Sequence, residues 1–182
     1  MGMPELLGAY DKYKVYETEN TWQTKATFKN QDGRVELSSG FQGICGGQSA
    51  LWCLHILSGK KGAESKPSYL RAASLQVRSE GLDGAVDRGE DQMFEPLGLR
   101  CVDELSKPTG EAALHMMSSD GNGVYMVGIP GHYMAAATRP GEYLFFNPDY
   151  GMWSLPTMFV FEDIVTCGRS ERMWKLYQMA LA

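Results

Sequence analysis

The stretch that decides the fold is Gly43-Ile44-Cys45-Gly46-Gly47-Gln48-Ser49-Ala50-Leu51-Trp52. Its glycines permit a tight turn, and the apolar residues that follow predict a buried helix over residues 46–58. Cys45 thus stands at a helix N-terminus, where the partial positive charge of the helix dipole favours the thiolate. Backbone N–H groups at the same helix start are suited to bind an oxyanion. This turn therefore predicts an accessible, nucleophilic cysteine.

The histidine partner of this cysteine can be chosen by elimination, because the chain has three histidines. His55 lies on the same predicted helix, about two and a half turns beyond Cys45, so its ring cannot reach the thiol. His115 belongs to a predicted amphipathic helix and is interpreted as structural. His132 follows a turn at Gly131 and begins a strand-like run of small residues, which leave room for a substrate. His132 is therefore the predicted general base.

A candidate for the third member of a catalytic triad follows on the next predicted strand. The segment there is Phe145-Phe146-Asn147-Pro148-Asp149-Tyr150-Gly151. Asn147 and Asp149 are two residues apart, so both point to the same side of an extended chain, and either is expected to accept the Nδ1–H of His132. A plain turn after a strand is the alternative interpretation. Cysteine, histidine and then an amide or carboxylate is the papain-type chain order for nucleophilic catalysis.

The overall composition limits the classes of function. The chain has 182 residues, enough for one well-buried core, and we expect residues 1–182 to form a single domain, with residues 1–40 as an N-terminal extension or hairpin. A net charge of −5 disfavours nucleic acid as the main partner. No apolar run approaches the roughly 20 residues of a membrane span. The N-terminus is neither basic nor followed by an apolar run, so no cleaved signal peptide is predicted.

The four cysteines show no pattern of metal binding. They are Cys45, Cys53, Cys101 and Cys167. No pair has C-x-x-C spacing and no cysteine–histidine cluster is present, so we expect neither a metal nor a cofactor. Apolar neighbours indicate that Cys53, Cys101 and Cys167 are small buried hydrophobes. We expect a reducing working compartment.

The order of the predicted elements indicates an α+β fold. Asp32-Gly33 between two strand-like runs predicts a hairpin. Further helices are expected over residues 67–79, 91–97 and 109–118, and strands over 123–129, 132–138 and 142–146. Residues 153–155 and 158–161 are expected to extend the sheet, and 171–181 to form a helix or a strand. A helical half with the cysteine thus precedes a sheet half with the histidine, and we expect a cleft between them.

The two motifs together resemble those of the YopT-like cysteine peptidases, papain-fold enzymes of bacterial type III effectors and larger toxins. The similarity covers residues 43–58 and 124–153. The positions that match the family pattern around the nucleophile and the histidine are Ser49, Trp52, His132, Phe145, Phe146, Pro148, Tyr150 and Gly151. The resemblance implies a papain-like fold in which a helical subdomain and an antiparallel sheet enclose the site, with Cys45 as nucleophile and His132 as base.

The sequence departs from the family pattern at the third member. The family has Asp-Pro-Asn where this chain has Asn147-Pro148-Asp149. Direct alignment gives Asn147 the orienting place, as papain itself uses Asn, and a swap to Asp149 is the alternative. Similar peptidase domains of bacteriocin-exporting transporters carry an oxyanion-hole glutamine several residues before the cysteine. The nearest glutamine here is Gln42, three residues before Cys45.

These features predict a thiol peptidase that cleaves a protein or peptide substrate. The resemblance implies an effector or toxin secreted without a cleaved signal peptide and acting in a host or target cell; otherwise the protein is cytoplasmic. A deamidase or transglutaminase and a cell-wall amidase use the same acyl-transfer chemistry and remain alternatives. A catalytically inactive, papain-like binding module is the alternative from another class. The sequence predicts no oligomeric state.

Overall fold

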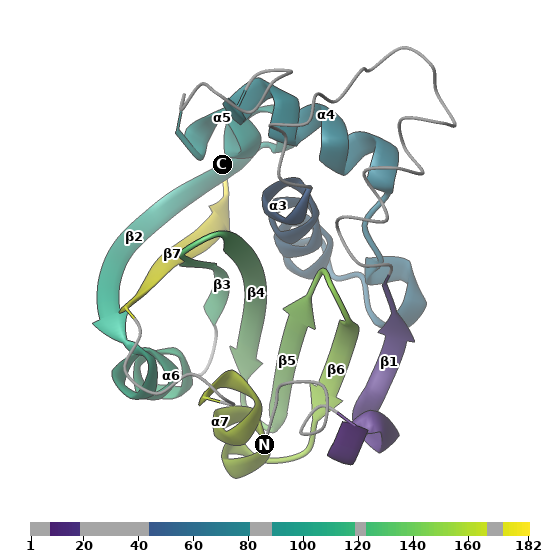
Figure 1. Cartoon of the computed structure of the whole chain (residues 1–182), viewed down its shortest axis with the longest axis vertical. Helices are drawn as coiled ribbons and strands as arrows, with labels where there is room; N and C mark the ends of the chain where they lie inside the picture. Colours follow the sequence, from purple (N-terminus) through teal and green to yellow (C-terminus); the bar gives the residue numbers. More distant parts are fainter. Residues whose placement is uncertain (1–7, 19–43, 81–88, 119–122, 167–172) are drawn as a thin grey trace.

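The computed structural model describes residues 8–18, 44–80, 89–118, 123–166 and 173–182. Within them, seven strands form one sheet in the order β1-β6-β5-β4-β3-β7-β2, with every neighbouring pair antiparallel (Figure 1). The strands are β1 (Lys14–Glu17), β2 (Leu99–Pro108), β3 (Gly123–Ile129), β4 (His132–Arg139), β5 (Glu142–Asn147), β6 (Gly151–Leu155) and β7 (Met173–Leu181). The N-terminal β1 is thus part of the sheet.

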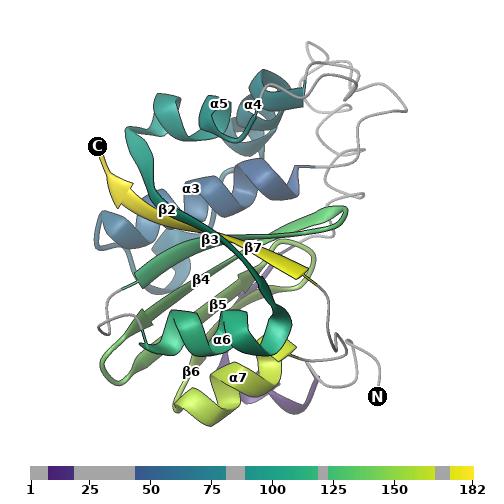
Figure 2. The same ribbon diagram turned by 90° about the vertical axis from the view of Figure 1, so that its left-hand side faces the viewer.

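Helices cover both faces of this sheet. They are α3 (Cys45–Leu57), α4 (Tyr69–Glu80), α5 (Asp91–Phe94), α6 (Thr109–Ser118) and α7 (Met158–Thr166), with short 3-10 turns at Asp11–Tyr13, Gly62–Ser65 and Glu95–Leu97. Figure 2 shows α3, α4 and α5 on one side of the sheet and α6 and α7 on the other. None of the helices that the structure describes is long and apolar enough to cross a membrane.

The strand alternation builds two cores, one on each face. On β3, Val124 and Met126 face the α3 side, whereas Tyr125 and Val127 face the α6–α7 side. Because successive strand residues point to opposite faces, a sheet covered on both sides must be apolar at nearly every position. This explains the almost continuous burial of β3, β4 and β5.

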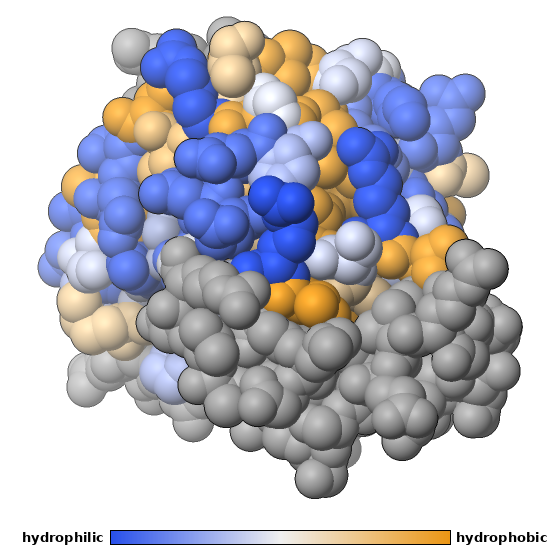
Figure 3. Space-filling view, turned by 90° about the horizontal axis from the view of Figure 1, so that it is seen from above, coloured by the Kyte–Doolittle hydropathy of each residue, from blue (hydrophilic) through white to orange (hydrophobic). Residues whose placement is uncertain are grey.

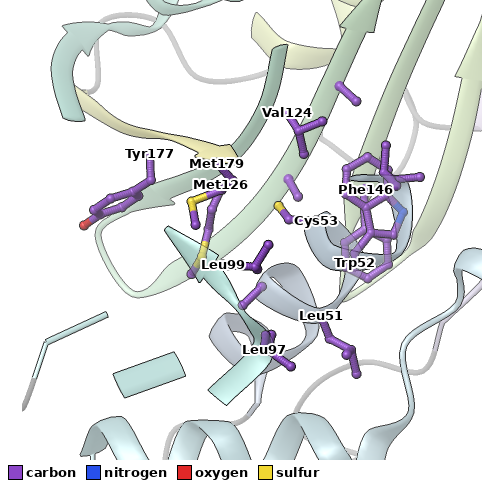
Figure 4. Close-up of a cluster of buried hydrophobic side chains, with 14 of the residues drawn as sticks. Leu51, Trp52, Cys53, Leu97, Leu99, Val124, Met126, Phe146, Tyr177 and Met179 are labelled. Carbon is purple, nitrogen blue, oxygen red and sulfur yellow. The ribbon is translucent and has the colours of Figure 1, made fainter. Parts of the chain in front are cut away.

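The core beneath α3 fixes the orientation of that helix. Trp52 stacks on Phe146 of β5, with ring centroids 5.6 Å apart and planes 7° apart, and its indole N–H donates to Met152 Sδ at 3.5 Å. Cys53 lies in the same cluster and is fully buried (Figure 4). With Trp52 held in this way, α3 cannot rotate about its axis without losing buried area and the stacked pair. The direction of its first turn is fixed accordingly.

The outer side of α4 faces solvent. Ala72, Ala73 and Leu75 are buried, whereas Leu70 is 54% exposed and Arg71 is also exposed. Seen from above, hydrophilic and apolar side chains are interspersed on this face of the molecule (Figure 3). Helix α4 is therefore amphipathic, with its apolar side toward α3.

Most elements predicted from the sequence are confirmed. Helices α3, α4 and α6, the short helical segment at 91–97 and strands β3 to β6 form within a few residues of the predicted bounds, and residues 173–181 adopt the strand alternative. The predicted hairpin at Asp32-Gly33 and the fourth cysteine, Cys167, lie outside the described residues.

One expectation is wrong, and two features of the fold were not predicted. Residues 158–161 belong to helix α7 instead of extending the sheet, because burial of Phe161, Ile164 and Val165 follows helical spacing. Strand β2 was not predicted; it is an edge strand of mostly exposed residues with a register shift between Cys101 and Asp103. The predicted order of a helical half before a sheet half did not include the second helical layer, in which α6 and α7 pack on the face opposite α3.

Candidate active site

Cys45 is the first residue of α3. The preceding residue, Ile44, is the N-cap and makes no side-chain cap hydrogen bond. The first N–H groups of a helix have no partner within the helix, so this end presents donors and a positive partial charge near the Cys45 thiol. The sequence predicted an accessible thiol at Cys45, but the residue is nearly buried. Cys45 is only 8% exposed, because neighbouring elements close around the first turn.

Two glycines allow that close packing. A Cβ at Gly47 would overlap the backbone carbonyl of Ala72 on α4, and the Gly47 N–H donates to Gln76 Oε1 at 2.8 Å. A Cβ at Gly46 would lie 2.7 Å from Gln76 Oε1 and 3.2 Å from the Tyr133 ring. The glycines that the sequence placed in a turn therefore act as a contact surface. They bring the start of α3 against α4 and against the residue that follows His132.

His132 is paired with Asn147. Its Nε2–H donates to Asn147 Oδ1 at 2.9 Å, and the backbone N–H of Asp149 donates to the same oxygen at 3.1 Å. Because a backbone N–H can only donate, the Asp149 contact identifies that atom as the amide oxygen, and His132 Nε2 must then carry the hydrogen. The Asp149 carboxylate is 3.8 Å from His132 Nε2 and more exposed than the imidazole. Of the two candidate orienting residues, Asn147 makes the hydrogen bond and Asp149 supplies a nearby negative charge.

The ring nitrogen in this bond differs from the expected one. We expected the third residue to bind Nδ1–H, but the structure uses Nε2. A neutral imidazole with its hydrogen on Nε2 presents Nδ1 as its proton acceptor. Nδ1 is therefore the ring nitrogen of His132 that can accept a proton.

A carboxylate that sequence reasoning missed lies beside this site. Glu90 Oε1 accepts hydrogen bonds from Tyr133 at 2.6 Å and from Tyr177 at 2.9 Å. Burial alone would raise the pKa of Glu90, but hydrogen bonds from the two tyrosines and its own backbone, with the nearby charge of Lys175, lower it below its usual value. Burial, then Glu90, and to a smaller extent Cys45, raise the pKa of Tyr133. Tyr133 therefore connects the first turn of α3 with Glu90.

The other two histidines, and Cys53 and Cys101, lie in surroundings that differ from those of Cys45 and His132. Burial raises the pKa of the Cys53 thiol, and burial also raises that of Cys101. The Nδ1–H of His55 donates to the Ser65 carbonyl at 2.9 Å, and burial lowers the pKa of the His55 ring. His115 packs edge-on against Tyr125, with centroids 6.3 Å apart. Cys53 is thus buried as predicted, and His55 is also buried, whereas Cys101 on the edge strand β2 is only partly buried, so its interpretation as a buried hydrophobe is wrong.

The sequence analysis also considered an oxyanion-hole glutamine and a metal site. Gln42, the nearest glutamine before the nucleophile, lies outside the described residues. Among the residues that are described, no three histidine, cysteine, aspartate or glutamate side chains gather in an arrangement that could hold a metal ion.

Comparison with solved structures identifies the fold. The Pseudomonas avirulence protein AvrPphB is similar with a TM-score of 0.57 at 9% identity, over 94% of this chain and 99% of that one. The murine cytomegalovirus ubiquitin-specific protease of tegument protein M48, solved with a ubiquitin-based suicide substrate, gives 0.56 at 9% identity, over 80% and 83%. PatoxP, a cysteine protease-like domain of the Photorhabdus asymbiotica toxin PaTox, gives 0.50 at 12% identity, over 88% and 60%.

Sequence comparison adds no family assignment. No protein-family model matches the chain, and no curated protein matches it in sequence. The structural similarity nevertheless confirms the predicted α+β, papain-like cysteine protease fold and the predicted resemblance to bacterial effector and toxin peptidases at the level of fold. At identities of 9–12%, the similarity extends to the fold alone.

Proposed function

We propose that this chain is a thiol peptidase that hydrolyses a peptide bond of a protein substrate. Cys45 is the nucleophile, His132 is the general base and then the general acid, and Asn147 orients His132. The observation that carries the proposal is the 2.9 Å hydrogen bond from His132 Nε2 to Asn147, on a strand whose next residue, Tyr133, contacts the first turn of α3. The pairing leaves the basic Nδ1 for the thiol.

The proposed reaction begins with proton transfer from Cys45 Sγ to His132 Nδ1. The thiolate attacks the carbonyl carbon of the substrate, and its negative charge moves to the carbonyl oxygen. Backbone N–H groups near Cys45 at the start of α3 are proposed to stabilise that oxyanion. His132 then protonates the leaving amine, and water activated by His132 hydrolyses the thioester.

The proposed role of Asn147 in orienting His132 is supported by the fixed position of its side chain. Its side chain is 1% exposed, and its Oδ1 is held by the Asp149 N–H as well as by His132. An amide oxygen fixes the tautomer and the plane of the ring, although it stabilises an imidazolium less than a carboxylate does. The Asp149 carboxylate at 3.8 Å is proposed to supply part of the missing charge.

The proposed substrate and setting follow from the fold neighbours. One neighbour was captured with a ubiquitin-based suicide substrate, and two others are an avirulence protein and a domain of a toxin. We infer that this protein acts on a folded protein or a peptide segment, as an effector or toxin in a host or target cell.

A second candidate function is a binding module of the same fold. The 8% exposure of Cys45 favours it, because a nucleophile must meet its substrate. The deamidase, transglutaminase and amidase alternatives share every residue of the proposed mechanism and differ only in the acceptor or the substrate.

The experiment that tests the proposal is a search for new N-termini by mass spectrometry. A lysate is incubated with wild-type protein or with the Cys45→Ala variant. A peptidase produces N-termini that are present only in the wild-type sample. Deamidated or amine-modified glutamines in place of new N-termini support the related acyl-transfer enzymes, and identical samples support the binding module.

A further inference from the structure

The N-terminal segment lies directly against the turn that carries the candidate orienting residue. Strand β1 pairs with β6, with Tyr16 opposite Met152 and Glu17 opposite Gly151. On its other side β6 pairs with β5, where Asn147 is opposite Gly151. The β5–β6 turn therefore lies beside a segment about 130 positions earlier in the chain.

Thr18, the residue after β1, makes two contacts with this turn. Its backbone N–H donates to the Tyr150 carbonyl at 3.3 Å, and its hydroxyl donates to the Asn147 carbonyl at 3.4 Å. The same Asn147 carbonyl accepts the Tyr150 N–H at 3.0 Å. Asn147 is thus held at its backbone oxygen by Thr18 and Tyr150, and at its side-chain oxygen by Asp149 and His132.

Close approach of β1 to the turn is built into Gly151. This residue has φ of +145°, and a Cβ there would overlap the carbonyl oxygen of Tyr16. Strand β1 can therefore lie this close to β6 only because residue 151 is a glycine. Thr18 is brought to the Asn147 carbonyl by backbone pairing and does not depend on its own side chain to reach it.

We propose that Thr18 is a positioning residue for the His132–Asn147 pair. The Thr18 hydroxyl fixes the backbone of Asn147, and this in turn fixes the position of the Asn147 side-chain oxygen. That oxygen holds the His132 imidazole in the orientation that directs Nδ1 toward the thiol. This inference rests on the proposed peptidase function for its catalytic consequence, but the two hydrogen bonds that link Thr18 to Asn147 and Asn147 to His132 do not depend on that function. The N-terminal segment then belongs to the active site as well as to the sheet.

The test compares Thr18→Val, which keeps the branched shape and removes the hydroxyl, with Thr18→Ser, which retains it. Tyr16→Phe is the matched control. It removes a different hydroxyl from the N-terminal segment, one that forms a hydrogen bond with Ser65 (3.1 Å) and not with Asn147. The first readout is ¹⁵N NMR of the His132 ring, which reports the tautomer and the solvent exchange of Nε2–H. The second is kcat and KM for a cleaved peptide. Thermal denaturation checks that each variant is folded.

We expect Thr18→Val to accelerate Nε2–H exchange and to lower kcat about 3- to 10-fold, with KM nearly unchanged, as for loss of one hydrogen bond. Thr18→Ser and Tyr16→Phe should both keep the Nε2–H exchange rate and kcat of the wild type. The inference is overturned if Thr18→Val changes neither readout, or if Tyr16→Phe changes both to the same extent, since general loosening of β1 then explains the effect. Absence of peptidase activity in the wild type overturns the proposed function, while the exchange data still decide the role of Thr18.

Discussion

Helix α3 carries two cysteines in opposite environments. Cys53 lies in the middle of the helix, fully buried beside Trp52, and burial raises the pKa of its thiol. Cys45 is the first residue, next to Gly46 and Gly47, where the positive end of the helix dipole and the ring of Tyr133 lie close by. The comparison shows that position along one helix gives two cysteines different surroundings, and it is these surroundings that set the pKa and the reactivity of a thiol.

The histidines repeat the same contrast. His55, near the far end of α3, donates to a backbone carbonyl and is kept neutral by burial, which lowers its pKa. His132 begins a strand and donates to a side-chain amide beside a partly exposed carboxylate. The predictions that follow test this division between a reactive and a structural end of the molecule.

The largest effect is expected from Cys45→Ala compared with Cys53→Ala. Cys45→Ala should lower peptidase turnover by about a thousandfold or more, because it removes the proposed nucleophile. Cys53→Ala should retain activity and lose about 1–2 kcal/mol of unfolding free energy through the cavity left in the core. Turnover and thermal denaturation of both variants measure this. An active Cys45→Ala protein would contradict the comparison.

Gly47→Ala should be the most destabilising substitution at the reactive end. Its Cβ would overlap the Ala72 backbone, so α3 and α4 must separate, at a cost of about 3 kcal/mol. The matched control is Gly110→Ala in α6, where nothing lies within 4 Å of the added Cβ. Alanine there should be neutral or stabilising by about 0.5–1 kcal/mol. Equal unfolding free energies for the two variants in urea would show that the helices do not pack this closely.

Asn147 and Asp149 should differ in their effect on turnover. Asn147→Ala should lower kcat by about tenfold or more, equivalent to about 1.4 kcal/mol per factor of ten, because the 2.9 Å bond to His132 is lost. Asp149→Ala should have a milder effect, and Asn147→Asp should retain activity or raise it. Steady-state kinetics of the three variants decide the assignment. If Asp149→Ala is inactive and Asn147→Ala is nearly normal, Asp149 is the orienting residue.

The smallest expected effect is a pH dependence of stability from His55. Burial lowers the pKa of its ring in the folded state, so the unfolded chain binds the proton first as the pH falls. The contribution of His55 is complete above the unfolded value of 6.5 and is lost progressively below it. His55→Asn keeps a donor for Ser65 and removes the titration. Urea denaturation between about pH 7 and pH 5 should show a shallower loss of stability in this variant than in wild type; parallel curves would exclude the effect.

Local sequence signals were sufficient for much of the fold. The glycine turn before an apolar run gave α3, and alternating residues between glycine and proline turns gave β3, β4 and β5. Chain order and elimination among the histidines also gave Cys45 and His132 as candidates. These signals succeed because they depend on the period of a single element.

Contacts between distant segments could not be predicted in this way. Glu90 meets Tyr133 and Tyr177, which are 43 and 87 residues away, and nothing in the glycine- and acid-rich stretch around it indicates those partners. The same holds for Gln76, which caps the Gly47 N–H from another helix. Strand β2 escaped prediction because an exposed edge strand lacks the apolar alternation of a central one.

The most direct test of the central claim is the rate of Cys45 alkylation as a function of pH, measured by mass spectrometry in wild type and in His132→Ala. We predict that Cys45 reacts at pH values well below the ordinary thiol pKa of about 8.5, and that His132→Ala moves its profile toward that value. Cys53 in the same molecules should stay unmodified while the protein is folded, because it is fully buried. A Cys45 profile with an ordinary pKa, unchanged by His132→Ala, would contradict the assignment of a Cys45–His132 catalytic pair.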